Sequence, residues 1–390
     1  MRWPVVLGVY WVTQLVESLG VSQIFAFMPL ELRHVGLPDA DIPRWVGLFG
    51  AIVFVVGLPL VPLWGVWADR YSRKAVIIRS ALVEAAVFAG VAASATPWQL
   101  AASLLLVGFQ LGNTGVMLAT IRDVVPRRRL GSAIAIFGVS GPIGFAVGPA
   151  LGGILVDGFG LPLAAMYVVS GALSLGTALL IALLIHEVRP STVPAGRILD
   201  LAYGAVRGIF TDRATARLFA IFGASLLARQ MTGPYIPLLV ERANGLDGLA
   251  GAIGLVVGTA GLIGALASPV MGVVGDRVGF RRVLTAALGG GGIALLLMSA
   301  TPSVPSLALV AGLNAGFAAA TTAMVFGLLA VEVPAERRSA TLNLVYLPLY
   351  LAGIVGPALG SVVVAAGLPV VFDLAGAVLL AVAVVVLRRR

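Results

Sequence analysis

The residues of this chain that could do chemistry are the few charged groups that interrupt long apolar stretches. Glu17 lies in the first stretch, with Thr13 and Gln14 one helical turn earlier on the same face. Placing a charge deep in a membrane helix costs about 2.5–3.5 kcal/mol. A carboxyl group in an apolar cavity binds a proton more readily than it does in water, which suits proton exchange or cation recognition. The alternative interpretation is a structural hydrogen bond between helices.

A second charge, Arg229, lies at a corresponding depth in the other half of the chain, with Ser225 and Thr232 along the same stretch. Because the depths match, we expect Glu17 and Arg229 to face one cavity. Polar and aromatic residues in an otherwise apolar cavity suit amphipathic or lipophilic ligands. The candidates for the rest of the lining are Gln14, Gln110, Asn113, Asn343, Tyr346 and Tyr350.

Two further charges, Arg79 and Glu84, are interpreted as an interfacial side chain and a structural partner of a neighbouring helix. The chain contains no cysteine, which excludes disulfides and thiolate chemistry. Its sequence has no metal-ligand cluster, nucleotide-binding loop or catalytic triad. We therefore predict neither an enzyme nor an ATP-driven pump, and expect no metal or cofactor.

The elements that must position these residues are membrane-spanning helices. Of the 390 residues, 59% are hydrophobic and 11% are charged, and the mean hydropathy is +1.05. A soluble domain is about a quarter charged, so a soluble protein is excluded. A spanning helix needs about 20 apolar residues, and a strand cannot satisfy its backbone alone in lipid. The apolar runs predict an all-α polytopic protein with twelve spans near 5–31, 44–64, 75–95, 98–121, 131–156, 161–186, 215–240, 249–271, 283–300, 304–330, 339–366 and 368–387.

The basic residues predict the orientation of these spans. The net charge is +9, but its distribution does not indicate nucleic-acid binding. If the amino terminus is inside, nearly all of the lysines and arginines fall in inside segments, and only Arg33, Arg44 and Arg242 fall in outside segments. Positive residues mark cytoplasmic loops. We therefore expect both termini to be cytoplasmic, in the inner membrane of a prokaryote.

The two halves of the chain repeat each other at an offset of 207 or 208 residues. Gly47 recurs as Gly254, and the hexapeptide at 147–152 recurs intact at 355–360. An even number of spans per repeat gives both halves the same orientation, with a pseudo-twofold axis along the membrane normal. We predict six-helix bundles over 1–186 and 215–390, joined by a cytoplasmic linker over 187–214 that carries a short interfacial helix.

The segment 65–74, Gly-Val-Trp-Ala-Asp-Arg-Tyr-Ser-Arg-Lys, resembles the loop signature of the major facilitator superfamily. A degenerate copy follows between spans eight and nine. The resemblance implies that these loops latch the halves together when the cavity opens outward; the alternative is a role in topology and lipid anchoring. Asp69 is also expected just before the third helix, where free backbone N–H groups favour an acid. The predicted latch residues are Gly65, Asp69, Arg70, Arg73, Lys74, Asp276, Arg277 and Arg281.

The fifth span resembles the antiporter signature of drug/proton exporters in that superfamily. Its small residues permit close helix packing, and its proline can bend the helix. The expected gate residues are Gly144, Gly148, Pro149, Gly152 and Gly153. The start of the third span resembles the drug:proton antiporter-1 branch. That branch usually carries an arginine in the fourth span, whereas 101–109 contains no charge.

The resemblance implies the major facilitator fold, alternating access, and proton-coupled efflux of small lipophilic or cationic compounds. The proton gradient would be the energy source, lipids and protons would be partners besides the substrate, and a monomer is expected. A metabolite permease for a sugar, amino acid or siderophore is the alternative. A non-transporting membrane sensor or lipid-handling scaffold is more remote, because a scaffold needs no gate.

Overall fold

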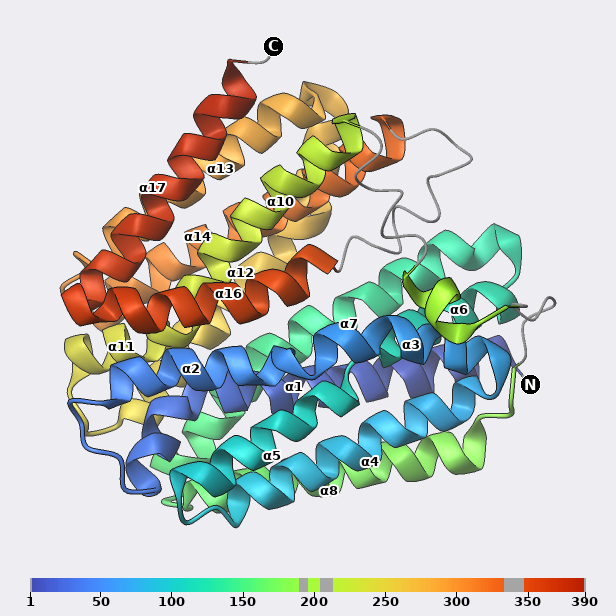
Figure 1. Ribbon diagram of the computed structural model, residues 1–390, viewed down its shortest axis with the longest axis horizontal. Helices are drawn as coiled ribbons and strands as arrows, with labels where there is room; N and C mark the ends of the chain where they lie inside the picture. Colours follow the sequence, from blue (N-terminus) through green and yellow to red (C-terminus); the bar gives the residue numbers. More distant parts are fainter. Residues whose placement is uncertain (1, 189–195, 204–212, 333–346, 389–390) are drawn as a thin grey trace.

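The computed structural model describes residues 2–188, 196–203, 213–332 and 347–388, and these residues form helices without strands (Figure 1). Eleven helices in this part of the chain are long and apolar enough to cross a membrane. The seventh predicted span is also helical, as two α-helices joined by a 3-10 turn, but it is not among those eleven. The all-helical polytopic class predicted from composition is confirmed.

The first half contributes six helical columns, three of which are built from two segments. The second column is interrupted at Val56, the fourth at residues 111–112, and the fifth ends in a π-helical turn. The elements of the first half are α1 (Trp3–His34), α2 (Ile42–Val55), α3 (Gly57–Arg70), α4 (Arg73–Ala92), α5 (Pro97–Gln110), α6 (Asn113–Val124), α7 (Arg127–Gly153), η1 (Ile154–Gly158) and α8 (Leu163–Leu184).

The second half follows the same order. The first described part of its fifth column begins at Leu347, so the start predicted at residue 339 lies outside the described residues. The elements of the second half are α10 (Arg213–Thr232), η2 (Gly233–Tyr235), α11 (Ile236–Asn244), α12 (Leu249–Val278), α13 (Phe280–Met298), α14 (Val304–Glu332), α16 (Leu347–Val363), η3 (Val364–Ala366) and α17 (Leu368–Leu387).

Proline and glycine set several of the helix ends that the apolar pattern had placed only approximately. Pro97 is the first residue of α5, and the Thr96 hydroxyl accepts from the Gln99 backbone N–H at 3.4 Å. Gly245 follows the last residue of α11 with a φ of 81°, a backbone angle that residues other than glycine rarely adopt. Such local signals keep the loops between spans short.

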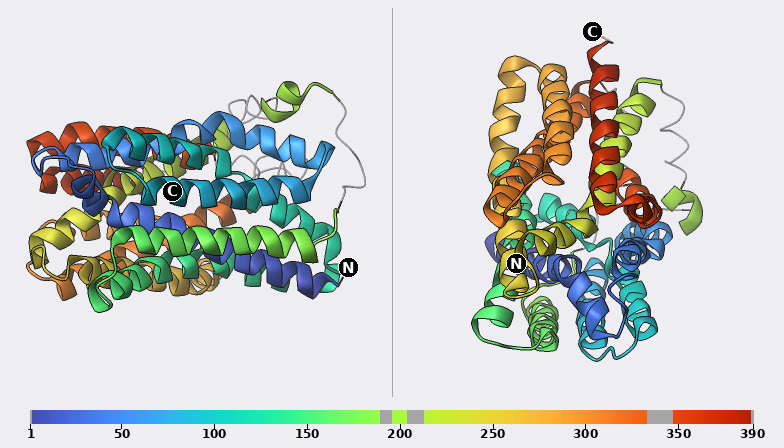
Figure 2. Two further views of the ribbon diagram at one scale, coloured as in Figure 1. Left: turned by 90° about the horizontal axis from the view of Figure 1, so that it is seen from below. Right: turned by 90° about the vertical axis from the view of Figure 1, so that its left-hand side faces the viewer.

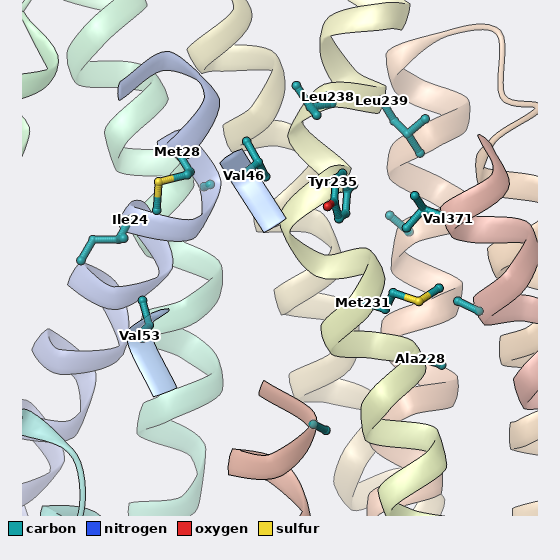
Figure 3. Packing of buried hydrophobic residues seen from close by; sticks show 14 of the residues in the cluster. Ile24, Met28, Val46, Val53, Ala228, Met231, Tyr235, Leu238, Leu239 and Val371 are labelled. Carbon is teal, nitrogen blue, oxygen red and sulfur yellow. The ribbon is translucent and has the colours of Figure 1, made fainter. Parts of the chain in front are cut away.

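The two halves meet at one end and diverge toward the other (Figures 1 and 2). One apolar core runs across both halves at the closed end, and Figure 3 shows part of it, with Ile24 and Met28 from α1 beside Val46 of α2, and Tyr235 beyond them. A second apolar cluster, which includes Tyr10, Val76 and Ile121, belongs to the first half alone. Helix α2 packs on α16, and α7 packs on α12.

The linker predicted between the halves is described only in part. Residues 198–203 are helical, and the rest of the predicted interfacial helix lies outside the described residues. The Tyr203 hydroxyl donates to the Pro59 carbonyl at 2.5 Å, and Arg70 Nη1 donates to the Gly196 carbonyl at 3.1 Å. Residues 196–203 of the linker therefore lie against α3.

Candidate functional site

Glu17 is buried in the middle of α1 and hydrogen-bonded to the fourth column. Glu17 is only 8% exposed, and Asn113 Nδ2 donates to Glu17 Oε2 at 2.8 Å. One turn away, Gln14 Oε1 accepts from the Thr114 hydroxyl at 2.9 Å. Four of the predicted lining residues, Glu17, Gln14, Gln110 and Asn113, thus lie together in the first half.

Arg229 lies in a narrow pocket of the second half, between α10, α13, α14 and α17. Ser225, Asn314 and Thr321 line the same pocket. Within the described ranges, no carboxylate lies at ion-pairing distance from Arg229, so it is not paired with Glu17. Tyr350 contacts the first half, with its ring 6.2 Å from that of Phe54. Asn343 and Tyr346 fall outside the described residues.

The loop signature forms an ion-pair cluster around Arg73. The Arg73 guanidinium, 3% exposed, binds Asp69 Oδ1 at 2.8 Å and Asp123 Oδ2 at 2.7 Å. Asp69 lies on the last turn of α3 rather than in a loop before the next helix. The free N–H groups that were expected to attract Asp69 bind other acceptors instead: the start of α4 is capped by Ser72, and Glu187 accepts from the Arg73 backbone N–H at 2.9 Å.

The other predicted latch residues do not join this cluster. Lys74 Nζ donates to the Ala182 carbonyl at 2.7 Å, and Arg70 reaches the linker. Gly65 has no neighbour within 4 Å of the place a side chain would occupy. In the second copy of the signature, Asp276 and Arg277 are exposed on the last turn of α12, and Arg281 is exposed at the start of α13.

The small residues of α7 face two different neighbours. A Cβ at Gly144 would meet the Leu15 carbonyl of α1, one at Gly148 would meet that of Leu19, and Gly152 lies against Phe27. These three glycines therefore pack within the first half. Gly153 faces the other half, because a Cβ there would come within 2.6 Å of the Ala250 carbonyl of α12.

Two equivalent contacts join the halves at the closed end. A Cβ on Gly47 of α2 would lie 2.6 Å from the Pro357 carbonyl of α16, and one on Gly254 of α12 would lie 2.6 Å from the Pro149 carbonyl of α7. Gly47 and Gly254 are repeat partners, and so are Pro149 and Pro357. The glycines and prolines of the repeat thus form the α2–α16 and α7–α12 interfaces.

Sequence reasoning missed two features of this site. Arg79 and Glu84, which we interpreted as an interfacial side chain and a structural partner of a neighbouring helix, also lie near Glu17 and interact with it electrostatically. At the closed end, Arg33 Nη2 donates to Glu241 Oε1 at 2.5 Å and joins α1 to α11. The repeat offset could have identified this second pair, because the two residues are 208 positions apart.

Comparisons with known proteins agree with this architecture. A family model described as the Major Facilitator Superfamily matches residues 10–249 and 218–390. The multi-drug resistance efflux pump PmrA of Streptococcus pneumoniae is 26% identical over 366 residues, which cover 93% of this chain and 90% of that protein. The multidrug resistance protein MdtG of Salmonella dublin is 29% identical over 297 residues, covering 74% of this chain and 71% of the relative.

Solved structures share the fold along the whole chain. A crystal structure of a mutant of the nucleoside transporter NupG aligns with a TM-score of 0.82 at 14% identity, covering 98% of this chain and 99% of that one. The human organic anion transporter MFSD10 aligns with a TM-score of 0.72 at 20% identity, covering 99% of this chain and 100% of that one. At these identities the likeness concerns the fold alone.

Proposed function

The chain belongs to the major facilitator superfamily, and on that premise we propose that it is a proton-coupled exporter of small lipophilic or cationic compounds. The observation that carries the coupling is Glu17, a carboxyl group buried in the middle of a membrane helix and hydrogen-bonded to Asn113 of another span. The substrate class is supported by PmrA and MdtG, relatives named for multidrug resistance. It is a transporter rather than an enzyme.

The proposed orientation places the basic end of the molecule in the cytoplasm. The ends of α3 and α7 at this side carry Arg70 and residues 127–129, as expected for cytoplasmic segments of an inner-membrane protein. Helix α1 begins and α17 ends toward that side, in keeping with cytoplasmic termini. The closed end that joins Arg33 to Glu241 then faces outward, and the two halves diverge toward the cytoplasm. The molecule is therefore in an inward-facing state.

Export follows from alternation between this state and one closed on the cytoplasmic side. In the inward-facing state the substrate enters between the halves and lies near Glu17 and Arg229. Protons entering from outside would bind at Glu17 after the outer interfaces open, and each charge moved across 100 mV supplies about 2.3 kcal/mol. The cluster around Arg73 would latch the cytoplasmic side in the outward-facing state. We propose that a monomer surrounded by lipid performs this cycle, with no cofactor besides the proton gradient.

Inverted membrane vesicles provide the test, because export appears there as uptake into the lumen. We expect an acidic lumen to accelerate uptake of the lipophilic cation tetraphenylphosphonium, and a protonophore to abolish that acceleration. Glu17→Gln should remove the response to the gradient while leaving the protein in the membrane. Glu31→Gln is the matched control, since Glu31 is a second buried carboxyl on α1, 3% exposed.

Other outcomes would replace the proposal. If uptake by the unmodified protein does not change with the proton gradient, a permease is indicated. If no tested compound is taken up, a sensor or scaffold is indicated. Retention of the gradient response by Glu17→Gln would show that Glu17 is not the coupling group.

A further inference from the structure

The fourth helical column is broken where it passes Glu17. Helix α5 ends at Gln110 and α6 begins at Asn113, and between them Gly112 has a φ of 100°. Glycine tolerates this conformation, which L side chains rarely adopt. The break removes the helical partners of nearby carbonyl oxygens, and in lipid such groups must be satisfied by the protein itself.

Helix α4 supplies those partners. Arg79 Nη2 donates to the Leu111 carbonyl at 3.2 Å and to the Gln110 carbonyl at 3.4 Å, and the Ser80 hydroxyl also donates to the Gln110 carbonyl. The Arg79 guanidinium lies over the Trp64 ring, 3.6 Å from its centroid. Arg79 thus fixes the backbone of Gln110 and places a positive charge between the third column and the break in the fourth.

The side chain of Gln110 lies beside two carboxyl groups. Glu17 approaches it from α1 and Glu84 from α4. Glu84 accepts from the Ser174 hydroxyl at 3.0 Å and is 3% exposed, while Gln110 is 1% exposed. Arg79 and Glu84 are the charged groups that interact with Glu17 among the described residues.

The side-chain amide of Gln110 is left without hydrogen bonds of good geometry. Neither its Nε2 nor its Oε1 has a partner, and Glu84 Oε1 is also unpartnered. Buried polar atoms are almost always satisfied. An amide can donate to an ionised carboxylate through its nitrogen and accept from a protonated carboxyl through its oxygen. If Glu17 and Glu84 share one proton, Nε2 of Gln110 can donate to the ionised carboxylate and Oε1 can accept from the protonated one.

The charges of the cluster favour the same state. With both carboxyls ionised, Glu17, Glu84 and Arg79 together carry one uncompensated negative charge, and both carboxyl residues are buried. An uncompensated buried charge is expensive, and a group in that position takes up a proton instead. A single bound proton makes the three residues neutral.

We propose that Glu17 and Glu84 form one proton-binding pair, bridged by the Gln110 amide, with Arg79 as the positioning residue that holds the bridge at the helix break. The pair rests on the proposed function, since it assigns the proton site of that transport cycle to two carboxyls from different helices. Glu84 is then a second coupling residue, and the positive charge missing from the fourth span is supplied by the third.

The test measures proton binding in the purified protein without substrate or gradient. Infrared spectra recorded across pH report the protonated carboxyl groups. Interacting sites titrate as a pair, so we expect Glu84→Gln to shift the pH at which Glu17 loses its proton by more than about one pH unit, and Glu17→Gln to do the same for Glu84. Glu31→Gln should remove its own contribution and leave the pair unchanged.

Gln110→Met gives an independent test that keeps both carboxyls. It should weaken the coupling between the two titrations, whether or not Glu84→Gln folds, and the remainder is the direct interaction between the two charges. Titration of Glu17 that is unchanged by both Glu84→Gln and Gln110→Met would overturn the pair. Because no substrate is needed, this result stands apart from export: a protein that fails to export can still contain the pair, and an exporter whose carboxyls titrate independently refutes the pair alone.

Discussion

Arg33 binds Glu241 at 2.5 Å, and the two residues are 208 positions apart, the offset that relates the two halves. Residues related by a twofold axis can touch only near that axis, so the pseudo-twofold axis that the repeat predicts would pass close to this ion pair. It joins α1 to α11 where the halves meet. Both side chains are partly buried, 23% and 22% exposed, and Arg33 also binds Asp39, which is 77% exposed.

We expect loss of this pair to loosen the closed end. A partly exposed ion pair contributes about 1 kcal/mol, which is roughly fivefold in the population of the open state. The chain has no cysteine, so Val46→Cys would introduce a single reporter at a position that is 0% exposed in the closed end. Glu241→Gln should raise its labelling rate by that factor. Asp39→Asn should leave the rate unchanged, and equal effects of the two variants would contradict a special role for the pair.

The two glycine contacts predict a steric effect at both interfaces. Gly47→Ala and Gly254→Ala each place a methyl group against a backbone carbonyl that cannot move freely. Overpacking of this kind costs about 1–3 kcal/mol, and here the cost falls on the closed state. Both variants should therefore increase labelling of Val46→Cys and slow export. Gly289→Ala on α13 is the control, because nothing lies within 4 Å of its added methyl group; a similar effect there would point to helix propensity instead.

The ion pairs of Arg73 predict a stability effect at the end of the first half that lies away from the closed end. Its buried guanidinium holds Asp69 of α3 and Asp123 of α6, so Arg73→Gln leaves two carboxylates facing each other. We expect a loss of about 2–3 kcal/mol, less than for a fully buried pair because both aspartates are partly exposed. The measurement is the thermal unfolding midpoint in detergent. Arg128→Gln, an exposed arginine at the start of α7, should not change the midpoint.

The contacts of Arg79 predict that its replacement weakens the coupling of transport to the proton gradient. Arg79→Gln removes the Arg79 bonds to the Leu111 and Gln110 carbonyls, leaves the Gln110 carbonyl with Ser80 alone, and removes the charge that balances the carboxyl pair. Arg79→Lys keeps the charge but not the planar fork that reaches two acceptors. Acceleration of vesicle uptake by an acidic lumen should be mostly lost in Arg79→Gln and partly retained in Arg79→Lys. Full retention in Arg79→Gln would be incompatible with its positioning role.

Much of the fold was predictable because lipid leaves the backbone few choices. Apolar runs located the columns, and the end of α17 at Leu387 agrees with the predicted limit. The breaks at Val56 and at Gly112 were not predicted, since a short interruption leaves the mean hydropathy of a span unchanged. The first part of the loop signature was also misplaced, because residues 65–70 continue the helix.

The candidate site was predictable only where a single span carried the signal. Glu17 was identified by its rarity in an apolar run, and the repeat identified Gly47 and Gly254 as partners. Arg79 and Glu84 were underestimated, because their importance depends on how α4 packs beside the break in another column. Contacts of that kind follow from tertiary packing and leave no periodic pattern in the sequence.

The matched interfaces at Gly47 and Gly254 also bear on how such a chain could arise. If the two halves were separate, identical six-helix chains, the α2–α16 and α7–α12 contacts would be the same surface occurring twice in a parallel homodimer. Gene duplication and fusion would then convert one self-complementary interface into two that can diverge independently. Charge asymmetries such as Arg33 opposite Glu241 become possible only after that fusion, because in a homodimer an axial residue would meet a copy of itself.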